Sequence, residues 1–253
     1  MKKNNLLPLL MAVILLSSMS PKEELDYKEI LKESDFYRGG QIPGIIWDLQ
    51  VQNIELDKLK NEITLKVEAS AQDNQQFTLI NFLKPKKYSG QKMLLRDNNM
   101  WFIKTGMRRP VPISGRQRLT GTASNADVAT TNYYLDYNIN ETTNETVNGE
   151  LCFVMELVAK NNLVSYSKIK YWIRQKDRKG IKAEYYAKSG KLIKIAYIEY
   201  NNIAEYQNIK HRFVSKVTIT DAINKKDKTI LNISVPTFKS FSNSKFQKNT
   251  LLD

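Results

Sequence analysis

The sequence has 253 residues, of which 42% are hydrophobic and 26% are charged, and its formal net charge is +13. This composition excludes a disordered chain, and the length suits one large all-β domain or two small ones. The excess of positive charge favours anionic partners such as nucleic acid, phospholipid headgroups or acidic proteins.

Residues 1–20 have the parts of a secretory signal peptide. The positive start MKKNN precedes an apolar run over residues 6–16, and Ser18 and Ser20 are the small residues expected before a cleavage site. The run is too short for a membrane-spanning helix, which needs roughly 20 residues. No cysteine lies near the cut, which excludes lipid attachment there. We predict cleavage after residue 20 and export to the periplasm; the alternative is an uncleaved anchor, because Pro21 is a poor residue after a cut.

A short helix is predicted over residues 23–35, where it would cover one opening of the fold. Leu25, Ile30 and Leu31 share one helical face, and Asp26 with two preceding glutamates favours the N-terminal end. Three glycines and a proline in YRGGQIPG then end the helix.

From Ile45 onward, the hydrophobic pattern alternates with a period near two, which is typical of half-buried antiparallel strands. Turns that carry Gly, Asn, Ser or Asp separate these segments. Residues 97–99, Asp-Asn-Asn, are predicted to form a tight hairpin turn, because Asn tolerates positive φ. A short helix capped by Ser124 or Asn125 is expected to interrupt the strands and to end near Thr131.

The pattern predicts about eleven strands, and no linker-like run divides them, so residues 21–253 are expected to form a single, mainly β domain. So many consecutive hairpins give a large antiparallel sheet, which curls or closes to manage its edges. One helix need not fill the concavity of such a sheet. The unfilled part would be a cavity.

No residue pattern predicts an enzyme, a cofactor or a metal centre. The single histidine, His211, has no Cys, Asp or Glu at ligand spacing, and no nucleophile elbow, Walker loop or GxGxxG motif occurs. Residues 136–141 begin like a calcium loop, but Val147 stands where the bidentate Glu is needed. The acids clustered there are typical of a solvated hairpin tip rather than of a glycosidase pair. Cys152, the only cysteine, lies in an apolar segment and is predicted to be a buried, inert thiol.

Positive charge is concentrated in two segments. Ten Lys or Arg lie between Lys84 and Arg118 against one acid, and ten lie between Lys168 and Lys194 against two. The aromatic residues interleaved with them would also suit a nucleic-acid surface. The export signal argues against a nucleic-acid partner, and lysines on the solvent side of strands are the commoner explanation in an exported β-protein.

The run from Leu94 to Tyr137, LLRDNNMWFIKTGMRRPVPISGRQRLTGTASNADVATTNYYLDY, resembles the signature of the LolA-like outer-membrane lipoprotein-sorting family. The matching positions are Met100 and Trp101, Arg109 and Pro110, Ile113 and Ser114, Gln117 to Gly121, and Ala126 to Val128. Further matches at YRGG, Trp47, FLKPKKYSG, YWIRQKDRKGIKAEYYAKSGKLIKI and SVPTFKSFSNSKF extend the resemblance over nearly all of the mature chain. The chain departs from some relatives at Thr122 and Ala123, where those have a Ser-Asp pair.

The resemblance implies an incomplete β-barrel with helical lid segments, as in LolA and LolB, whose hollow holds the acyl chains of lipoproteins or other lipid. Candidates to line this cavity are Trp47, Trp101 and Phe102. Candidates for the cavity mouth or a partner contact are Arg108, Arg109, Arg116 and Arg118. Ordinary core packing is the alternative for the aromatic residues, and solvation or ion pairing is the alternative for the arginines. Hydrophobicity does not show whether Trp101 or its neighbours face the hollow, because both faces of the strand are apolar.

Two functions remain open at this point. One is a periplasmic carrier or chaperone that moves acylated or otherwise apolar cargo toward the outer membrane, with transient contact to a membrane surface and an inner-membrane exporter as a possible partner. The other is a non-carrier accessory protein that docks to an envelope lipid exporter through its basic face. Co-purifying lipid would favour the first function over the second.

Overall fold

The computed structural model describes residues 25–96, 98–129 and 132–252. The predicted signal peptide, residues 1–20, lies outside them, and its cleavage stays a prediction. Within the described part, no helix is both long and apolar enough to cross a membrane.

The described chain is mainly β. Its helices are α1 (Tyr27–Phe36) and α2 (Tyr133–Asp136), with short 3-10 helices η1 (Lys86–Tyr88), η2 (Asn125–Val128), η3 (Asn243–Phe246) and η4 (Asn249–Leu251). Its strands are β1 (Ile45–Glu55), β2 (Lys58–Gln72), β3 (Gln75–Lys84), β4 (Gln91–Arg96), β5 (Asn99–Lys104), β6 (Val111–Ile113), β7 (Arg118–Thr120), β8 (Ala123–Ser124), β9 (Tyr137–Val147), β10 (Glu150–Ala159), β11 (Lys168–Arg174), β12 (Gly180–Tyr186), β13 (Leu192–Glu199), β14 (Asn202–Tyr206), β15 (Ile209–Phe213), β16 (Lys216–Asp221), β17 (Lys228–Ile233) and β18 (Thr237–Phe238).

The predicted N-terminal helix is present as α1, but its first residue is Tyr27 rather than residue 23. Asp26 is its N-cap, and the carboxylate accepts the backbone N–H groups of Lys28 and Glu29 at 2.9 and 3.1 Å. Such a cap satisfies N–H groups that have no partner within the helix. The helix buries Ile30 and Leu31 in the main core, as its hydrophobic face predicts.

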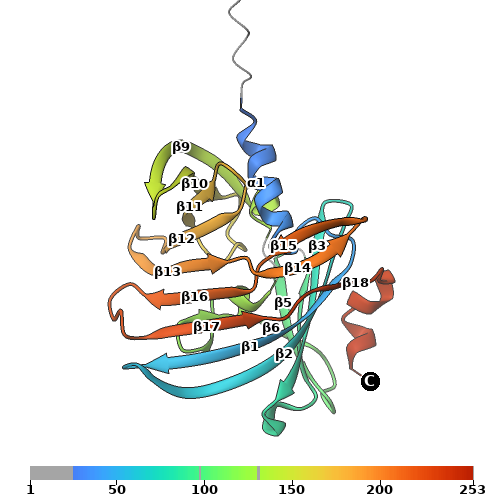
Figure 1. The fold of residues 1–253 in the computed structure, drawn as a ribbon. Coiled ribbons are helices and arrows are strands. Elements are labelled where there is room, and N and C mark those ends of the chain that lie inside the picture. Colours follow the sequence, from blue (N-terminus) through green and yellow to red (C-terminus); the bar gives the residue numbers. More distant parts are fainter. Residues whose placement is uncertain (1–24, 97, 130–131, 253) are drawn as a thin grey trace, which may run out of the picture.

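One antiparallel sheet of fourteen strands dominates the fold (Figure 1). Its order is β6-β5-β4-β3-β2-β1-β17-β16-β13-β12-β11-β10-β9, and β18 adds to β1. The end strands β6 and β9 do not pair with each other, so the sheet curls without closing into a barrel. The predicted fold class, a large curled antiparallel sheet that forms an incomplete barrel, is confirmed.

The strands are more numerous than the eleven or so predicted. β6, β7, β8 and β18 have only two or three residues each, which is too short for alternation to reveal. β14 and β15 form a separate hairpin. His211 lies in that hairpin, with its ring centroid 5.1 Å from that of Phe36, and no group of three metal-ligating side chains occurs among the described residues.

The predicted β4–β5 hairpin turn and the predicted short helix after Ser124 are both present. Arg96 pairs with Asn99 across the β4–β5 turn, where Asn98 has a φ of 63°, so Asn supplies the positive φ that the turn needs. Ser124 caps η2 in a capping box with Asp127. η2 ends at Val128 rather than near Thr131, and α2 follows it with Asn132 as its N-cap.

The sheet is covered on both faces along β3, β4 and β5. Met93, Met100 and Phe102 belong to the main core inside the curl. The residues at the alternate positions face outward and belong to a second cluster, where Phe246 and Leu251 of the C-terminal segment cover them. These outward-facing strand residues are Phe77, Leu79, Leu94, Trp101 and Ile103. Cys152 is fully buried in a third, small cluster, so the prediction that it is buried is confirmed.

Candidate functional site

The described residues between β6 and β9, 114–129 and 132–136, form a central segment inside the curled sheet. Thr122 anchors it, because its Oγ1 donates to the carbonyl oxygen of Ile219 at 3.0 Å and lies 2.9 Å from Oγ1 of Thr229. Buried side chains of this central segment, Tyr133 among them, join the main core. The central segment therefore divides the hollow, and three pockets border it.

The first, the apolar pocket, has a volume of about 410 Å³ and lies between the central segment and β2–β6. Its apolar lining residues are Ile63, Phe82, Tyr88, Met93, Phe102, Val111, Ile113 and Leu119. The rest of its wall is polar and consists of Asn61, Gln91, Gln117, Arg118, Thr120 and Asn125. The strand residues point inward because they occupy alternate positions on their strands. This volume falls within the ~300–1,000 Å³ typical of ligand sites.

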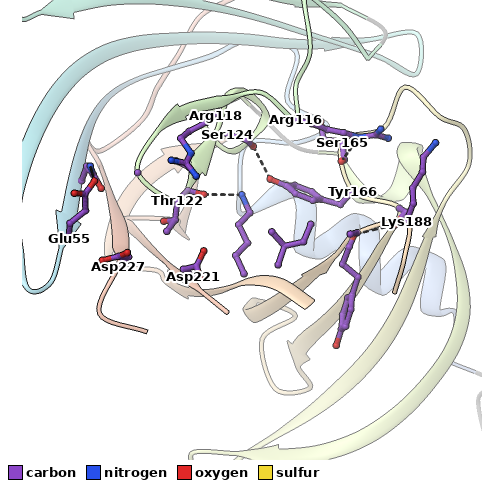
Figure 2. Close-up of a pocket in the computed structure, with 18 residues that line it drawn as sticks. Glu55, Arg116, Arg118, Thr122, Ser124, Ser165, Tyr166, Lys188, Asp221 and Asp227 are labelled. Atoms are coloured by element: carbon purple, nitrogen blue, oxygen red, sulfur yellow. Dashed lines mark hydrogen bonds between the residues drawn. The ribbon is translucent and has the colours of Figure 1, made fainter. Parts of the chain in front are cut away.

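The second, the polar pocket, has about the same volume, 400 Å³, and opposite charges line it. Figure 2 shows Glu55, Asp221 and Asp227 on one side and Arg116 and Lys188 on the other. The three acids are held by nearby groups: the Asn53 amide donates to Glu55, and backbone N–H groups of neighbouring turns donate to Asp221 and Asp227.

The third, the inner pocket, is a narrow space of about 80 Å³ behind the central segment. Its lining combines apolar residues such as Met100 and Ile198 with Arg38 and several tyrosines. Arg38 donates to the hydroxyls of Tyr133 and Tyr171, each at 3.4 Å, and its guanidinium lies 4.4 Å from the Tyr133 ring centroid. This cation is thus held by aromatic rings and hydroxyls inside the curl.

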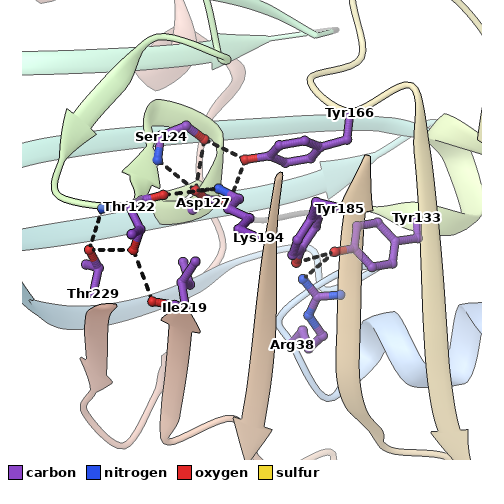
Figure 3. A network of polar contacts seen from close by, with 10 residues as sticks. All are labelled: Arg38, Thr122, Ser124, Asp127, Tyr133, Tyr166, Tyr185, Lys194, Ile219 and Thr229. Atoms are coloured by element: carbon purple, nitrogen blue, oxygen red, sulfur yellow. Dashed lines mark hydrogen bonds and ion pairs between the residues drawn. The ribbon is translucent and has the colours of Figure 1, made fainter. Parts of the chain in front are cut away.

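A buried ion pair separates the polar pocket from the inner pocket (Figure 3). Lys194 pairs with Asp127, and their side chains are 5% and 6% exposed. Asp127 also accepts the Tyr166 hydroxyl at 2.9 Å and the Ser124 hydroxyl at 2.9 Å. Burial raises the pKa of Tyr166 well above its usual value, so the hydroxyl stays protonated and can donate. The carboxylate of the pair therefore has hydrogen-bond donors besides Lys194, as a buried charge requires.

Two buried contacts attach α1 to the rest of the fold. The Ser34 hydroxyl lies 2.9 Å from the hydroxyl of Tyr171, and the Asp35 carboxylate accepts the backbone N–H of Tyr134 in α2 at 2.8 Å. Asp35 is fully buried, and burial raises its pKa to about 7. α1 and α2 are thus joined through a carboxyl group that titrates near neutral pH.

The three aromatic residues predicted for the cavity lie in different places. Phe102 lines the apolar pocket. Trp101 lies on the opposite face of β5, where it packs in the outer cluster under the C-terminal segment, with Lys248 4.6 Å from its ring centroid. Adjacent residues on a strand face opposite ways, so Trp101 and Phe102 cannot share the hollow. Trp47 is buried in the main core.

The four predicted arginines also separate. Arg116 supports the loop between β10 and β11, where it donates to the carbonyl oxygens of Ser165 and Val164 at 2.8 Å and of Asn162 at 3.1 Å. Arg118 borders both the apolar and the polar pocket. Arg108 and Arg109 are exposed on the β5–β6 connection.

Sequence reasoning missed the buried pair of Lys194 and Asp127. A signal was present, since Lys194 shares its strand face with Ala196 and Ile198, which are apolar core residues. A lysine at an inward position needs a buried partner. Asp127 lies 67 residues away in the chain, so the sequence could not identify it as that partner.

A family model described as that of an uncharacterized protein matches residues 74–253. No curated protein matches the chain. Among solved structures, the chain is similar to a LolA superfamily protein from Nitrosomonas europaea, with a TM-score of 0.76 and 23% identity over 90% of this chain and 100% of that one.

Two further crystal structures are similar. One is a putative outer membrane lipoprotein-sorting protein domain from Vibrio parahaemolyticus, with a TM-score of 0.73 and 19% identity over 89% of this chain and 98% of that one. The other is a DUF1329 family protein from Desulfovibrio piger, with a TM-score of 0.71 and 18% identity over 88% and 97% of the two chains. These likenesses confirm the fold that the sequence resemblance implied.

Proposed function

The chain belongs to the family whose model matches residues 74–253, and from this membership and its LolA-superfamily fold we propose that it is a carrier for acylated or other apolar cargo. It acts in the periplasm after loss of residues 1–20, as a single domain over residues 21–253, and it is not an enzyme. The observation that carries the proposal is the apolar pocket on the inner side of the sheet, about 410 Å³ in volume and lined by eight apolar and six polar side chains.

The chemistry of the apolar pocket suits an acyl chain. Each buried CH₂ group contributes about 0.8 kcal/mol, so part of one chain gives useful and reversible affinity. The inner pocket, at about 80 Å³, is too small for such a chain, which makes the apolar pocket the binding site in this conformation. Arg118 borders both this pocket and the polar pocket, so the polar end of the cargo can extend past it.

Two neighbouring aromatic residues provide a matched test. Phe102→Ala removes part of the pocket wall, and we expect it to weaken binding of a fluorescent fatty-acid probe roughly tenfold, about 1.4 kcal/mol. Trp101→Ala removes outer packing, and we expect it to lower the free energy of unfolding by about 1–3 kcal/mol while probe affinity stays within about twofold. The readouts are fluorescence titration and urea denaturation.

The reverse pattern contradicts the proposed site. If Trp101→Ala weakens probe binding as much as Phe102→Ala does, the acyl chain does not lie on the inner face. If the wild-type chain itself binds no probe, the carrier function is wrong, and the docking alternative takes its place.

A further inference from the structure

Two chain connections lie beside the opening of the apolar pocket, at one end of strands β3 to β6. These are the β3–β4 connection, which contains η1, and the β5–β6 connection, and both lie at the lower end of the molecule in Figure 1. They are in contact, because the backbone N–H of Thr105 donates to the carbonyl oxygen of Gly90 at 3.2 Å. Tyr88 and Val111, which border the apolar pocket, flank this contact.

Five exposed cations lie in these connections or, for Lys104, at the end of β5 beside them; together we call them the basic edge: Lys86, Lys87, Lys104, Arg108 and Arg109. In the part of the chain that the structure describes, none of the five forms an ion pair. Between Lys84 and Arg118 the sequence has ten Lys or Arg and a single acid, at residue 97. The basic edge therefore carries a positive charge that its own sequence neighbours leave largely uncompensated.

The second basic segment of the sequence differs from the basic edge. There the strand lysines pair with acids across the sheet, as Lys168 does with Glu156 at 3.0 Å and Lys170 with Glu145 at 3.0 Å. Arg174 and Lys182 also have carboxylate partners, Asp177 and Glu184. That segment is largely neutralised within the fold, so of the two basic segments only the first, which holds the basic edge, keeps a cluster of unpaired charge for a partner.

We infer that the basic edge docks the protein onto a lipid bilayer that contains anionic phospholipids. Each Lys or Arg near such a surface contributes about 1 kcal/mol of attraction, which acts within a Debye length of about 10 Å at 0.1 M salt. Val111, 42% exposed at the pocket mouth, adds apolar surface at the same place. The choice of a bilayer over an acidic protein rests on the proposed carrier function, because docking this edge points the apolar pocket at the membrane.

Vesicle co-sedimentation tests the docking surface. The vesicles are phosphatidylcholine alone, or phosphatidylcholine with roughly one third phosphatidylglycerol, at low and high salt. The test variant changes Lys86, Lys87, Arg108 and Arg109 to Gln. The matched control changes Lys58, Lys60, Lys225 and Lys226 to Gln. These four exposed lysines form no ion pairs among the described residues and lie at the start of β2 and in the β16–β17 turn.

We expect the wild-type chain to bind the anionic vesicles and to be released by salt. The test variant should bind them at least about tenfold more weakly, and the control should lose less than about threefold. Equal losses in the two variants, equal binding to both vesicle types, or no vesicle binding would overturn the inference. Fatty-acid probe binding, measured on the same variants, separates failure of docking from failure of the carrier function, because the basic edge lies outside the pocket lining.

Discussion

Replacing Lys194 by methionine is expected to lower the free energy of unfolding by about 3–5 kcal/mol, because it leaves a buried carboxylate without its cation. Methionine keeps most of the side-chain volume, so the loss reflects the charge rather than a cavity. Asp127 would keep its hydroxyl and backbone donors but lose its ammonium partner. Urea denaturation of both proteins measures the change.

Lys228→Met is the control for this experiment. Lys228 pairs with Asp57 at 3.5 Å on the surface, where the side chains are 34% and 62% exposed, and such pairs contribute about 0–1 kcal/mol. If Lys194→Met costs no more than this control, the pair of Lys194 and Asp127 does not stabilise the wall between the polar and inner pockets.

Because of Asp35, the free energy of unfolding is expected to decrease as the pH rises from about 4 to about 7. Burial raises the pKa of this carboxyl to about 7, against about 3.9 in an unfolded chain, while the nearby Arg38 charge acts in the opposite direction. In this pH range the folded state holds a proton that the unfolded state has lost, so raising the pH favours unfolding. The shift of about three pKa units corresponds to up to about 4 kcal/mol.

Asp35→Asn isolates this contribution. The amide oxygen can still accept the Tyr134 N–H, but the group no longer titrates. The difference in unfolding free energy between variant and wild type should therefore rise in favour of the variant from about pH 4 to pH 7 and then level off. Asp136, whose pKa burial also raises, is present in both proteins and cancels in the difference. Parallel stability curves for the two proteins would contradict the assignment.

Long strands could be predicted from the sequence because alternation persists over them. β10 and β11 bury alternate residues toward the main core, and the predicted apolar set Ile169, Tyr171 and Ile173 is fully buried. Strands of two or three residues, such as β6 and β18, carry too few positions to show a period. Their pairing depends on strands that are distant in the sequence, as β18 does on β1.

The site was less predictable than the fold. Trp101 and Phe102 are both aromatic, and the inner face could not be chosen because the outer face is apolar too. Phe246 and Leu251, more than a hundred residues further along the chain, cover that outer face. An alternating pattern indicates that a side chain is buried, but it does not indicate which segment of the chain covers it. The position of Arg116 could not be predicted for the same reason, because its partners are carbonyl oxygens of the β10–β11 loop, distant in the sequence.

Native mass spectrometry of the exported chain, purified gently and without detergent, tests most directly whether it carries acyl cargo. We predict a peak at the mass of residues 21–253 plus a lipid or lipoprotein acyl species. Ile113→Trp, which fills the apolar pocket, should lose this adduct, whereas Ile223→Trp at an exposed turn should keep it. A wild-type chain found only at its bare mass, or an adduct that Ile113→Trp retains in full, would contradict a carrier that binds its cargo in the apolar pocket.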